Sequence, residues 1–252
     1  RCLEFIRRDF RRAGHALTEE ARDEVQKHRT RLVELEVAFN KNIDEFQDGL
    51  DLTREQLAGV PDDAIERLSA GTAPDTFRVS LDYPDYYPFL ENAKDPQARR
   101  VLQAKFDSRG GEANKKRLAE VLRLRDEAAK LLGYRNHAEY VLEERMAAKP
   151  EAALDFLSGL REKLYRKGRP ELKALLALKR AEEGSRSDGV LRAWDWRYYH
   201  NQLMKKRFQV DKQKIKEYFP TDLVVEQMLK IYQEVLGLRF GEIRPAQAWH
   251  PD

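Results

Sequence analysis

Apolar residues recur at three- and four-residue steps along most of the chain, which is the spacing of an amphipathic helix. The longest such stretch follows Thr18, a residue type that caps helices, and runs to about residue 46. Its apolar positions are Val25, Leu32, Leu35, Phe39, Ile43 and Phe46. Residues 3–13 show the same spacing without a capping residue before them, so we expect the chain to begin inside a helix.

Shorter helices with the same spacing are predicted along the rest of the chain. They are expected over 61–68, 96–107, 112–132, 136–145, 150–166, 170–183, 195–207, 211–218 and 220–236. Thr53 is expected to cap one more short element, which a turn ends near Pro61. The segment DYPDYYPFLENAKDP (82–96) contains too many prolines for a long element.

Two segments are typical of short strands. Residues 76–82 alternate apolar Phe77, Val79 and Leu81 with polar neighbours, which is the period of a half-buried strand. A second extended segment is expected over 236–244 and is a candidate partner for the first. The whole pattern therefore predicts an all-α fold, a multi-helix lobe with at most one or two short strands.

We expect a single helical region over residues 1–252. The stretch EEGSRSDG (182–189) combines glycine, serine and charge without an apolar anchor, so it is predicted to be a surface loop and is the candidate for a subdomain edge. No repeat of fixed period occurs, so a solenoid is not predicted. Both ends of the chain interrupt a predicted element, which predicts an internal fragment of a longer protein.

Charge adds little to this picture. The chain carries 47 Lys and Arg against 44 Asp and Glu, for a net charge of +3. This excess comes from the first twelve residues, which hold five arginines against Glu4 and Asp9. A nucleic-acid or anionic-membrane surface needs a sustained basic excess, so we expect neither partner.

The single cysteine, Cys2, excludes an internal disulfide. No apolar run approaches the roughly 20 residues of a membrane-spanning helix. We therefore expect a soluble protein of a reducing compartment, the cytoplasm.

Histidine spacing argues against a metal site in this chain. The histidines are His15, His28, His137, His200 and His250. No two of them are four residues apart, as a His-Glu-x-x-His zinc helix requires, and one cysteine cannot form a Cys-x-x-Cys site. A Gly-x-Ser-x-Gly nucleophile turn is also missing. We therefore predict no metal ligand and no catalytic residue in these 252 residues.

Two features are candidates for ligand contact. The first is a proline-rich aromatic segment, which contains Tyr83, Tyr86, Tyr87 and Phe89 together with Pro84 and Pro88. It either lines a peptide-binding groove or packs a long connection onto the helices. The second is Arg109 before the glycine pair 110–111, which forms either a plain helix–helix turn or an anion site built from free backbone N–H groups.

A second aromatic group surrounds Asp195 and contains Trp194, Trp196, Tyr198 and Tyr199. Asp195 is predicted to cap the helix that starts here. Rings on both faces of this helix indicate a buried helix start more than a binding site.

Seven segments of the sequence carry a resemblance to a known family. They are RRDFRRAG (7–14), TREQLAGVPDD (53–63), FRVSLDYPDYYPFLENA (77–93), FDSRGGEANKKRLAEVLRLRDEAAKLLGYRNHAEYVLEERMA (106–147), WDWRYYHNQL (194–203), IKEYFP (215–220) and AWHPD (248–252). In their order and spacing they resemble the thimet oligopeptidase, neurolysin and bacterial oligopeptidase A/dipeptidyl carboxypeptidase family of zinc metallopeptidases. The resemblance covers essentially the whole chain.

The resemblance implies two mostly helical lobes that enclose a channel for short, unstructured peptides. It also implies one zinc ion, held by two histidines of a His-Glu-x-x-His helix and a downstream glutamate, with the motif glutamate as general base. In the family these residues lie C-terminal to the stretch present here. No catalytic residue is therefore carried over, and zinc is expected only in the full-length enzyme.

We accordingly expect the helical channel wall of such an oligopeptidase, inactive by itself, with Tyr83, Tyr86, Tyr87 and Arg109 as candidates for the channel lining. The expected partners are short peptides, the missing C-terminal catalytic region and, through exposed apolar surface, further copies of the chain. The alternative is a stand-alone helical peptide-binding or scaffolding protein that descends from this family and holds peptides without cutting them.

Overall fold

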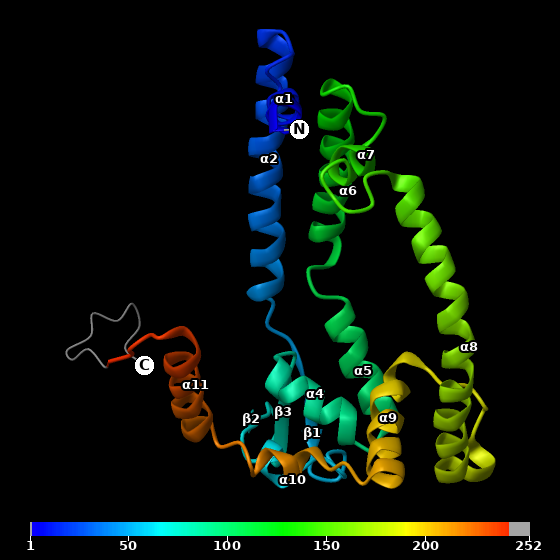
Figure 1. Ribbon diagram of the computed structural model, residues 1–252. Helices are drawn as coiled ribbons and strands as arrows, with labels where there is room; N and C mark the ends of the chain where they lie inside the picture. The colour runs from blue at the N-terminus through cyan, green and yellow to red at the C-terminus, as the bar shows by residue number, and fades with distance from the viewer. Residues whose placement is uncertain (1, 242–252) are drawn as a thin grey trace. The chain divides into compact units, whose positions relative to one another are not determined.

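The computed structural model describes residues 2–241, apart from the side chains of residues 212 and 213. The described residues form eleven α-helices, one 3-10 turn and three short strands (Figure 1). The helices are α1 (Cys2–Ala13), α2 (Glu19–Asp44), α3 (Asp62–Ile65), α4 (Tyr83–Asn92), α5 (Pro96–Asp107), α6 (Gly111–Leu131), α7 (His137–Leu142), α8 (Pro150–Glu183), α9 (Ala193–Phe208), α10 (Lys212–Lys216) and α11 (Thr221–Leu236). The strands are β1 (Gly49–Thr53), β2 (Ser69–Ala70) and β3 (Thr76–Ser80), and the 3-10 turn η1 is Gly184–Arg186. The fold is predominantly helical, as expected.

The chain divides into two compact units, Arg1–Asn201 and Gln202–Asp252. The division falls within α9. The segment 182–189, our candidate for a subdomain edge, lies inside the first unit, where its first residues end α8 and the next form η1.

The three strands form one antiparallel sheet in the order β1-β3-β2. The expected strand at 76–82 is confirmed as β3, but its partners are β1 and β2. The segment expected over 236–244 is not a strand through residue 241, and its remaining residues lie outside the described part. On one face of the sheet Leu52 pairs with Phe77, whereas on the other Asp51 accepts a hydrogen bond from Arg78 at 3.0 Å.

Thr53 ends β1 and caps the short element that follows, as predicted, and that element is a turn over residues 54–59. Its N–H donates to Gln56 Oε1 at 3.0 Å, and the N–H of Gln56 donates to Thr53 Oγ1 at 3.4 Å. These are the reciprocal bonds of a helix capping box. Here they close a turn, because the chain folds back at Gly59 to pack beside α4.

The proline-rich segment 82–96, predicted to hold no long element, contains the ten-residue helix α4 over residues 83–92. Pro84 lies in the first turn, where a helix needs no N–H, so only Pro88 removes an interior hydrogen bond. Burial outweighs that loss, because Tyr86, Phe89 and Leu90 are at most 3% exposed. They belong to a core formed by β1, β3, α3, α4 and α5.

A second, smaller core lies between α2 and α6, where Leu35 packs against Val121 and Leu124. The start of α2 follows the prediction, since Thr18 Oγ1 accepts a hydrogen bond from the N–H of Ala21 at 3.4 Å. Helices α5, α6 and α11 also begin and end within a residue of their predicted limits.

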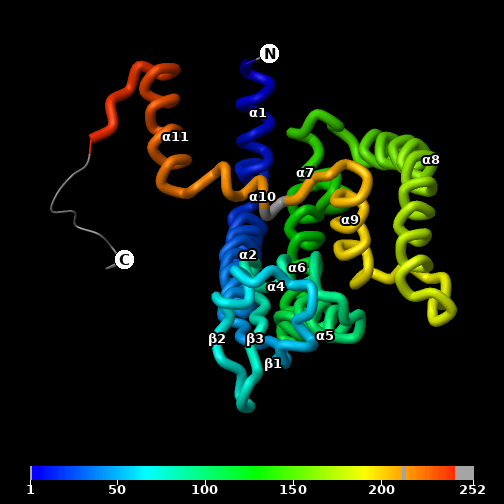
Figure 2. The backbone as a smooth tube through the Cα atoms, turned by 90° about the horizontal axis from the view of Figure 1, so that it is seen from below, coloured from blue at the N-terminus to red at the C-terminus, as the bar shows by residue number. Residues whose placement is uncertain are grey.

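One continuous helix, α8, replaces the two helices predicted over 150–166 and 170–183. Gly168 and Pro170 favour a helix break, yet the helix continues through them, and Figure 2 shows α8 changing direction along its length. Near its C-terminal end α8 buries Leu175 and Lys179. Its N-terminal half leaves several apolar side chains exposed: Leu154, Phe156, Leu157, Leu160 and Leu164.

Glu143, directly after α7, ties α1 to the rest of the first unit. Its carboxylate pairs with Arg11, lies 2.9 Å from Arg12 Nη1 and accepts a hydrogen bond from the Tyr134 hydroxyl at 2.5 Å. Burial acts to raise the pKa of Glu143. The hydrogen bonds from Tyr134 and Arg12 and the charges of the two arginines outweigh burial, so this pKa lies below its usual value.

We expect Glu143→Gln to lower stability at neutral pH and to lose its effect in acid. A carboxyl group with a depressed native pKa contributes stability above its unfolded pKa of about 4.3, and that contribution is lost as pH falls through the native pKa. Urea unfolding of the wild type and of Glu143→Gln between pH 7 and pH 3 measures the difference in their free energies of unfolding. Glu112→Gln removes an exposed carboxylate whose partner, Lys115, lies on the same helix, and is the control. If the stability difference between the wild type and Glu143→Gln stays constant down to pH 3, the pKa of Glu143 is not depressed in the folded protein.

Candidate functional site

Three tyrosines of α4 lie together because of their helical spacing. Tyr83 and Tyr87 are four residues apart, on one helix face, and their ring centroids are 5.1 Å apart. Tyr86 meets Tyr87 edge to face at 5.2 Å. Tyr86 is buried, whereas Tyr83 is 59% exposed, so the group joins the core to the surface.

Helix α5 brings Phe106 and Arg109 to the same place. The Phe106 ring stacks on Tyr86 with centroids 3.9 Å apart and ring planes 16° from parallel. Arg109, just after the helix, folds back on Phe106, with its guanidinium carbon 3.6 Å from the ring centroid and its Nε donating to the Phe106 carbonyl at 3.0 Å. This is a cation–π contact fixed by a hydrogen bond.

Helix α9 adds an arginine that the sequence reasoning missed. The guanidinium carbon of Arg197 lies 4.5 Å from the Tyr87 ring centroid and 5.7 Å from that of Trp196. The sequence offers one signal, since Arg197 stands among the rings of WDWRYY. We call Tyr83, Tyr86, Tyr87, Phe106, Arg109 and Arg197 the arginine–tyrosine cluster.

The four predicted channel-lining residues, Tyr83, Tyr86, Tyr87 and Arg109, thus all belong to one cluster. Their role in a channel remains a prediction. Burial is the largest cause of a raised pKa of about 12 at Tyr86, with a further contribution from the charge of Asp107. Arg197 and Arg109 act in the opposite direction. The Tyr86 hydroxyl is therefore neutral at physiological pH and adds no charge to the cluster.

The glycine pair after Arg109 makes the turn between α5 and α6. Gly110 has φ +81°, and a Cβ there would lie 2.4 Å from Asn114 Nδ2. Asn42 donates to the Gly110 carbonyl at 2.9 Å. These contacts favour the turn over the anion site as the reason for the glycines.

Asp195 does not occupy the N-cap position, but its side chain caps the start of α9 from within, because its Oδ2 accepts a hydrogen bond from the N–H of Arg192 at 3.2 Å. It lies inside the first turn of α9, fully buried, and its Oδ1 accepts from Arg99 Nη2 at 3.0 Å while its Oδ2 accepts from Lys179 Nζ at 2.6 Å. Arg99 also donates to the carbonyls of Ala93, Lys94 and Trp194. This buried ion cluster of Arg99, Lys179 and Asp195 joins α5, α8 and α9.

Asn201 attaches α9 to α4, in addition to the attachment at Asp195. Its Nδ2 donates to the Glu91 carbonyl and to Asn92 Oδ1, both at 3.0 Å and both at the end of α4. Arg197 therefore lies between two points, Asp195 and Asn201, at which α9 is attached to α5 and α4. This attachment explains why Arg197 reaches Tyr87.

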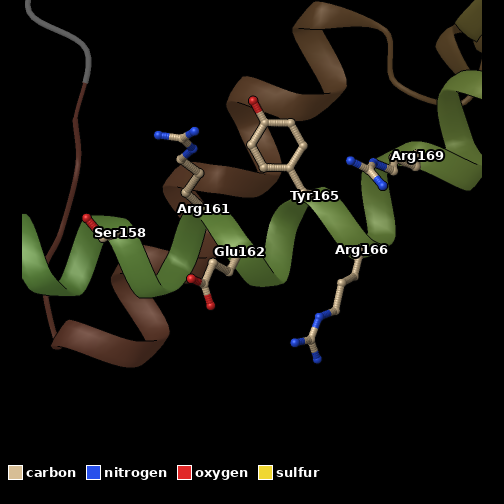
Figure 3. A pocket seen from close by; sticks show the side chains of 6 residues that line it. All are labelled: Ser158, Arg161, Glu162, Tyr165, Arg166 and Arg169. Carbon is tan, nitrogen blue, oxygen red and sulfur yellow. The ribbon is translucent and has the colours of Figure 1, made fainter.

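One depression follows α8, with a volume of about 770 Å³. Its lining residues are Ser158, Arg161, Glu162, Tyr165, Arg166 and Arg169 (Figure 3). All six come from a single helix, so no second element forms an opposite wall, and we assign this depression no ligand.

Within the described residues, no three His, Cys, Asp or Glu side chains gather where they could hold a metal ion. No helix in the described part is long and apolar enough to cross a membrane.

Comparison with known proteins decides the family. Residues 89–252 match the model of peptidase family M3. The chain belongs to peptidase family M3. It is 32% identical to saccharolysin of Saccharomyces cerevisiae over 97% of this chain and 36% of that protein. It is 28% identical to oligopeptidase A of Escherichia coli over 97% of this chain and 38% of that protein.

The thimet-like oligopeptidase of Dictyostelium discoideum gives a similar result, with 29% identity over 96% of this chain and 37% of that protein. This member of family M3 thus spans little more than a third of the length of the curated relatives it matches. The tyrosines of α4 lie before residue 89, where the family match begins, but inside the region that these relatives share with the chain almost end to end.

Proposed function

We propose that this chain forms a wall of the peptide channel in a cytoplasmic zinc oligopeptidase and does not cut peptides by itself. The match to peptidase family M3 over residues 89–252 carries the proposal. The names of the relatives, which are oligopeptidases, supply the substrate class: short peptides.

The described residues do not fit a zinc site. The histidines in this part of the chain are dispersed, each beside a different neighbour: His15 beside Phe10, His28 beside Glu127, His137 beside Tyr140 and His200 beside Trp196. His250 lies outside the described residues. We therefore assign no ligand and no catalytic step to this chain, and zinc belongs to the remainder of the proposed enzyme.

The arginine–tyrosine cluster is the part of this chain best suited to touch a peptide. Tyr83 exposes 59% of its surface, while Tyr87 is half-buried against Arg197. Tyrosine rings offer large contact area and a hydroxyl with only two rotatable bonds to order, which suits them to bind chains of varied sequence.

Peptide binding without cleavage tests this proposal. We expect the 252-residue chain, verified by mass, to contain no stoichiometric zinc, to leave a fluorogenic octapeptide uncut and to bind it saturably in calorimetry. Tyr83→Ala should weaken binding several-fold. Tyr165→Ala removes a similarly exposed tyrosine of α8, 55% against 59%, and should change nothing. Stoichiometric zinc with hydrolysis, or no peptide binding, would overturn the proposal.

A further inference from the structure

Two arginines of the arginine–tyrosine cluster have positive charges that no carboxylate among the described residues neutralises by an ion pair. Arg109 donates one hydrogen bond, from Nε to the Phe106 carbonyl, and its two terminal nitrogens stay free of described acceptors. Within the part of the chain that the structure describes, Arg197 lies over the rings of Tyr87 and Trp196 and makes no hydrogen bond or ion pair.

Three other buried or half-buried arginines of this unit have a carboxylate partner, whereas Arg29 and Arg117 donate to neutral oxygens, those of the Arg12 carbonyl and the Asn114 side chain. Arg99 pairs with Asp195 at 3.0 Å, Arg12 with Glu143 at 2.9 Å and Arg78 with Asp51 at 3.0 Å. A partly desolvated guanidinium is costly when it lacks a hydrogen-bonded partner. Arg109 and Arg197 thus differ from these three in lacking a carboxylate partner among the described residues.

Both arginines lie on rings that contact Tyr86. Arg197 of α9 lies over Tyr87, whose ring centroid is 5.2 Å from that of Tyr86, and Arg109 lies over Phe106, whose centroid is 3.9 Å from it. Asp107 is the acidic group nearby, and it accepts a hydrogen bond from Gln103 at 3.4 Å rather than from either arginine.

The ring contacts leave N–H groups of both guanidinium groups available to bind an anion. A guanidinium that lies flat on a ring keeps its N–H edge free, and that edge matches the two oxygens of a carboxylate. The attachment of α9 at Asp195 and Asn201 orders Arg197 in advance, so little side-chain freedom is lost on binding. A peptide also brings apolar surface that Tyr83 can cover.

We propose that the arginine–tyrosine cluster binds a carboxylate of a peptide, with Arg197 as the main donor and Arg109 as the second. This inference rests on the proposed function and specifies the group that this wall recognises. The carboxylate comes either from the peptide C-terminus or from an aspartate or glutamate side chain. Both sources present the same two oxygens.

Calorimetry on the 252-residue chain at low salt separates these sources. The probes are three N-acetylated hexapeptides of one neutral sequence: a free acid, a C-terminal amide, and an amide with one internal glutamate. We expect the wild type to bind the free acid at least about tenfold more tightly than the plain amide, as one charged pair predicts. If the glutamate amide matches the free acid, side-chain carboxylates are also recognised.

Arg197→Gln should abolish the preference for the acid. Arg100→Gln is the matched control, because Arg100 also faces a ring, 5.6 Å from that of Trp194, but lies outside the cluster. Circular dichroism checks folding, and Arg109→Gln replaces Arg197→Gln if the latter unfolds. Equal binding of acid and amide by the wild type, or equal losses in Arg197→Gln and Arg100→Gln, would overturn the inference while leaving the channel wall intact. Binding of none of the peptides would overturn both.

Discussion

Replacing Asp195 by alanine is expected to lower the free energy of unfolding by about 3–5 kcal/mol, the usual cost of removing one partner from a buried ion pair. Asp195 has no exposed surface, and its two oxygens serve Arg99 and Lys179, which are 1% and 4% exposed. Alanine would leave the buried charge of Arg99 without a carboxylate partner. Lys179 would keep only its longer contacts with Glu183 at 3.8 Å and Asp188 at 4.0 Å. Three helices meet at this point, so the loss should affect the whole first unit.

Urea unfolding followed by circular dichroism measures this loss. Asp188→Ala is the control, since Asp188 also lies within 4.0 Å of Lys179 and pairs with Arg192, but its side chain is 44% exposed. An exposed pair contributes at most about 1 kcal/mol. If Asp195→Ala costs no more than Asp188→Ala, the buried ion cluster does not stabilise this unit.

Replacing Gly59 by alanine is expected to cost about 2–4 kcal/mol, the sum of backbone strain and overpacking. Gly59 has φ +96°, a backbone angle that residues with a side chain rarely adopt. The Cβ atom of an alanine at this position would lie 2.4 Å from the carbonyl oxygen of Asn92. That oxygen belongs to the backbone and cannot rotate away. The substitution would push the turn after β1 off the end of α4.

Gly133→Ala separates strain from clash. Gly133 has a similar φ of +87°, but nothing lies within 4 Å of the place that an alanine methyl group would occupy, so only strain of about 1–2 kcal/mol is expected. The difference between the two variants in chemical unfolding is the cost of the clash. Equal losses would show that Gly59 is required for its backbone angle alone.

Local signals were sufficient to predict most helices of this chain. Asp95 before Pro96 is such a signal, and in the structure its carboxylate accepts hydrogen bonds from the N–H groups of Gln97 and Ala98 at the start of α5. Strand β1 could not be found this way. It has five residues, and Gly49–Thr53 becomes a strand only by pairing with Thr76–Ser80, more than twenty positions later.

The candidate site was predictable only in part, because some of its residues are close in the sequence and others are not. Tyr83, Tyr86 and Tyr87 are neighbours in sequence, and Arg109 precedes a glycine pair that marks it as a candidate. Arg197 is about ninety positions beyond Arg109, and it joins the cluster only because Asp195 and Asn201 attach α9 to the core. The sequence pattern indicated a buried helix start around Asp195 but not its ion pairs, since the partners Arg99 and Lys179 come from α5 and α8.

Helix α8 is anchored unevenly along its length. At about 1.5 Å per residue its 34 residues measure roughly 51 Å, but only the C-terminal turns, with Leu175 and Lys179, are anchored in buried contacts. The turns around Leu157 and Leu164 face solvent and depend mainly on their own backbone hydrogen bonds. Local stability should therefore rise steadily along a single helix. The turns between the Glu151–Arg135 ion pair at the start of α8 and the buried Leu175 can therefore fray and re-form while the core of the unit stays packed.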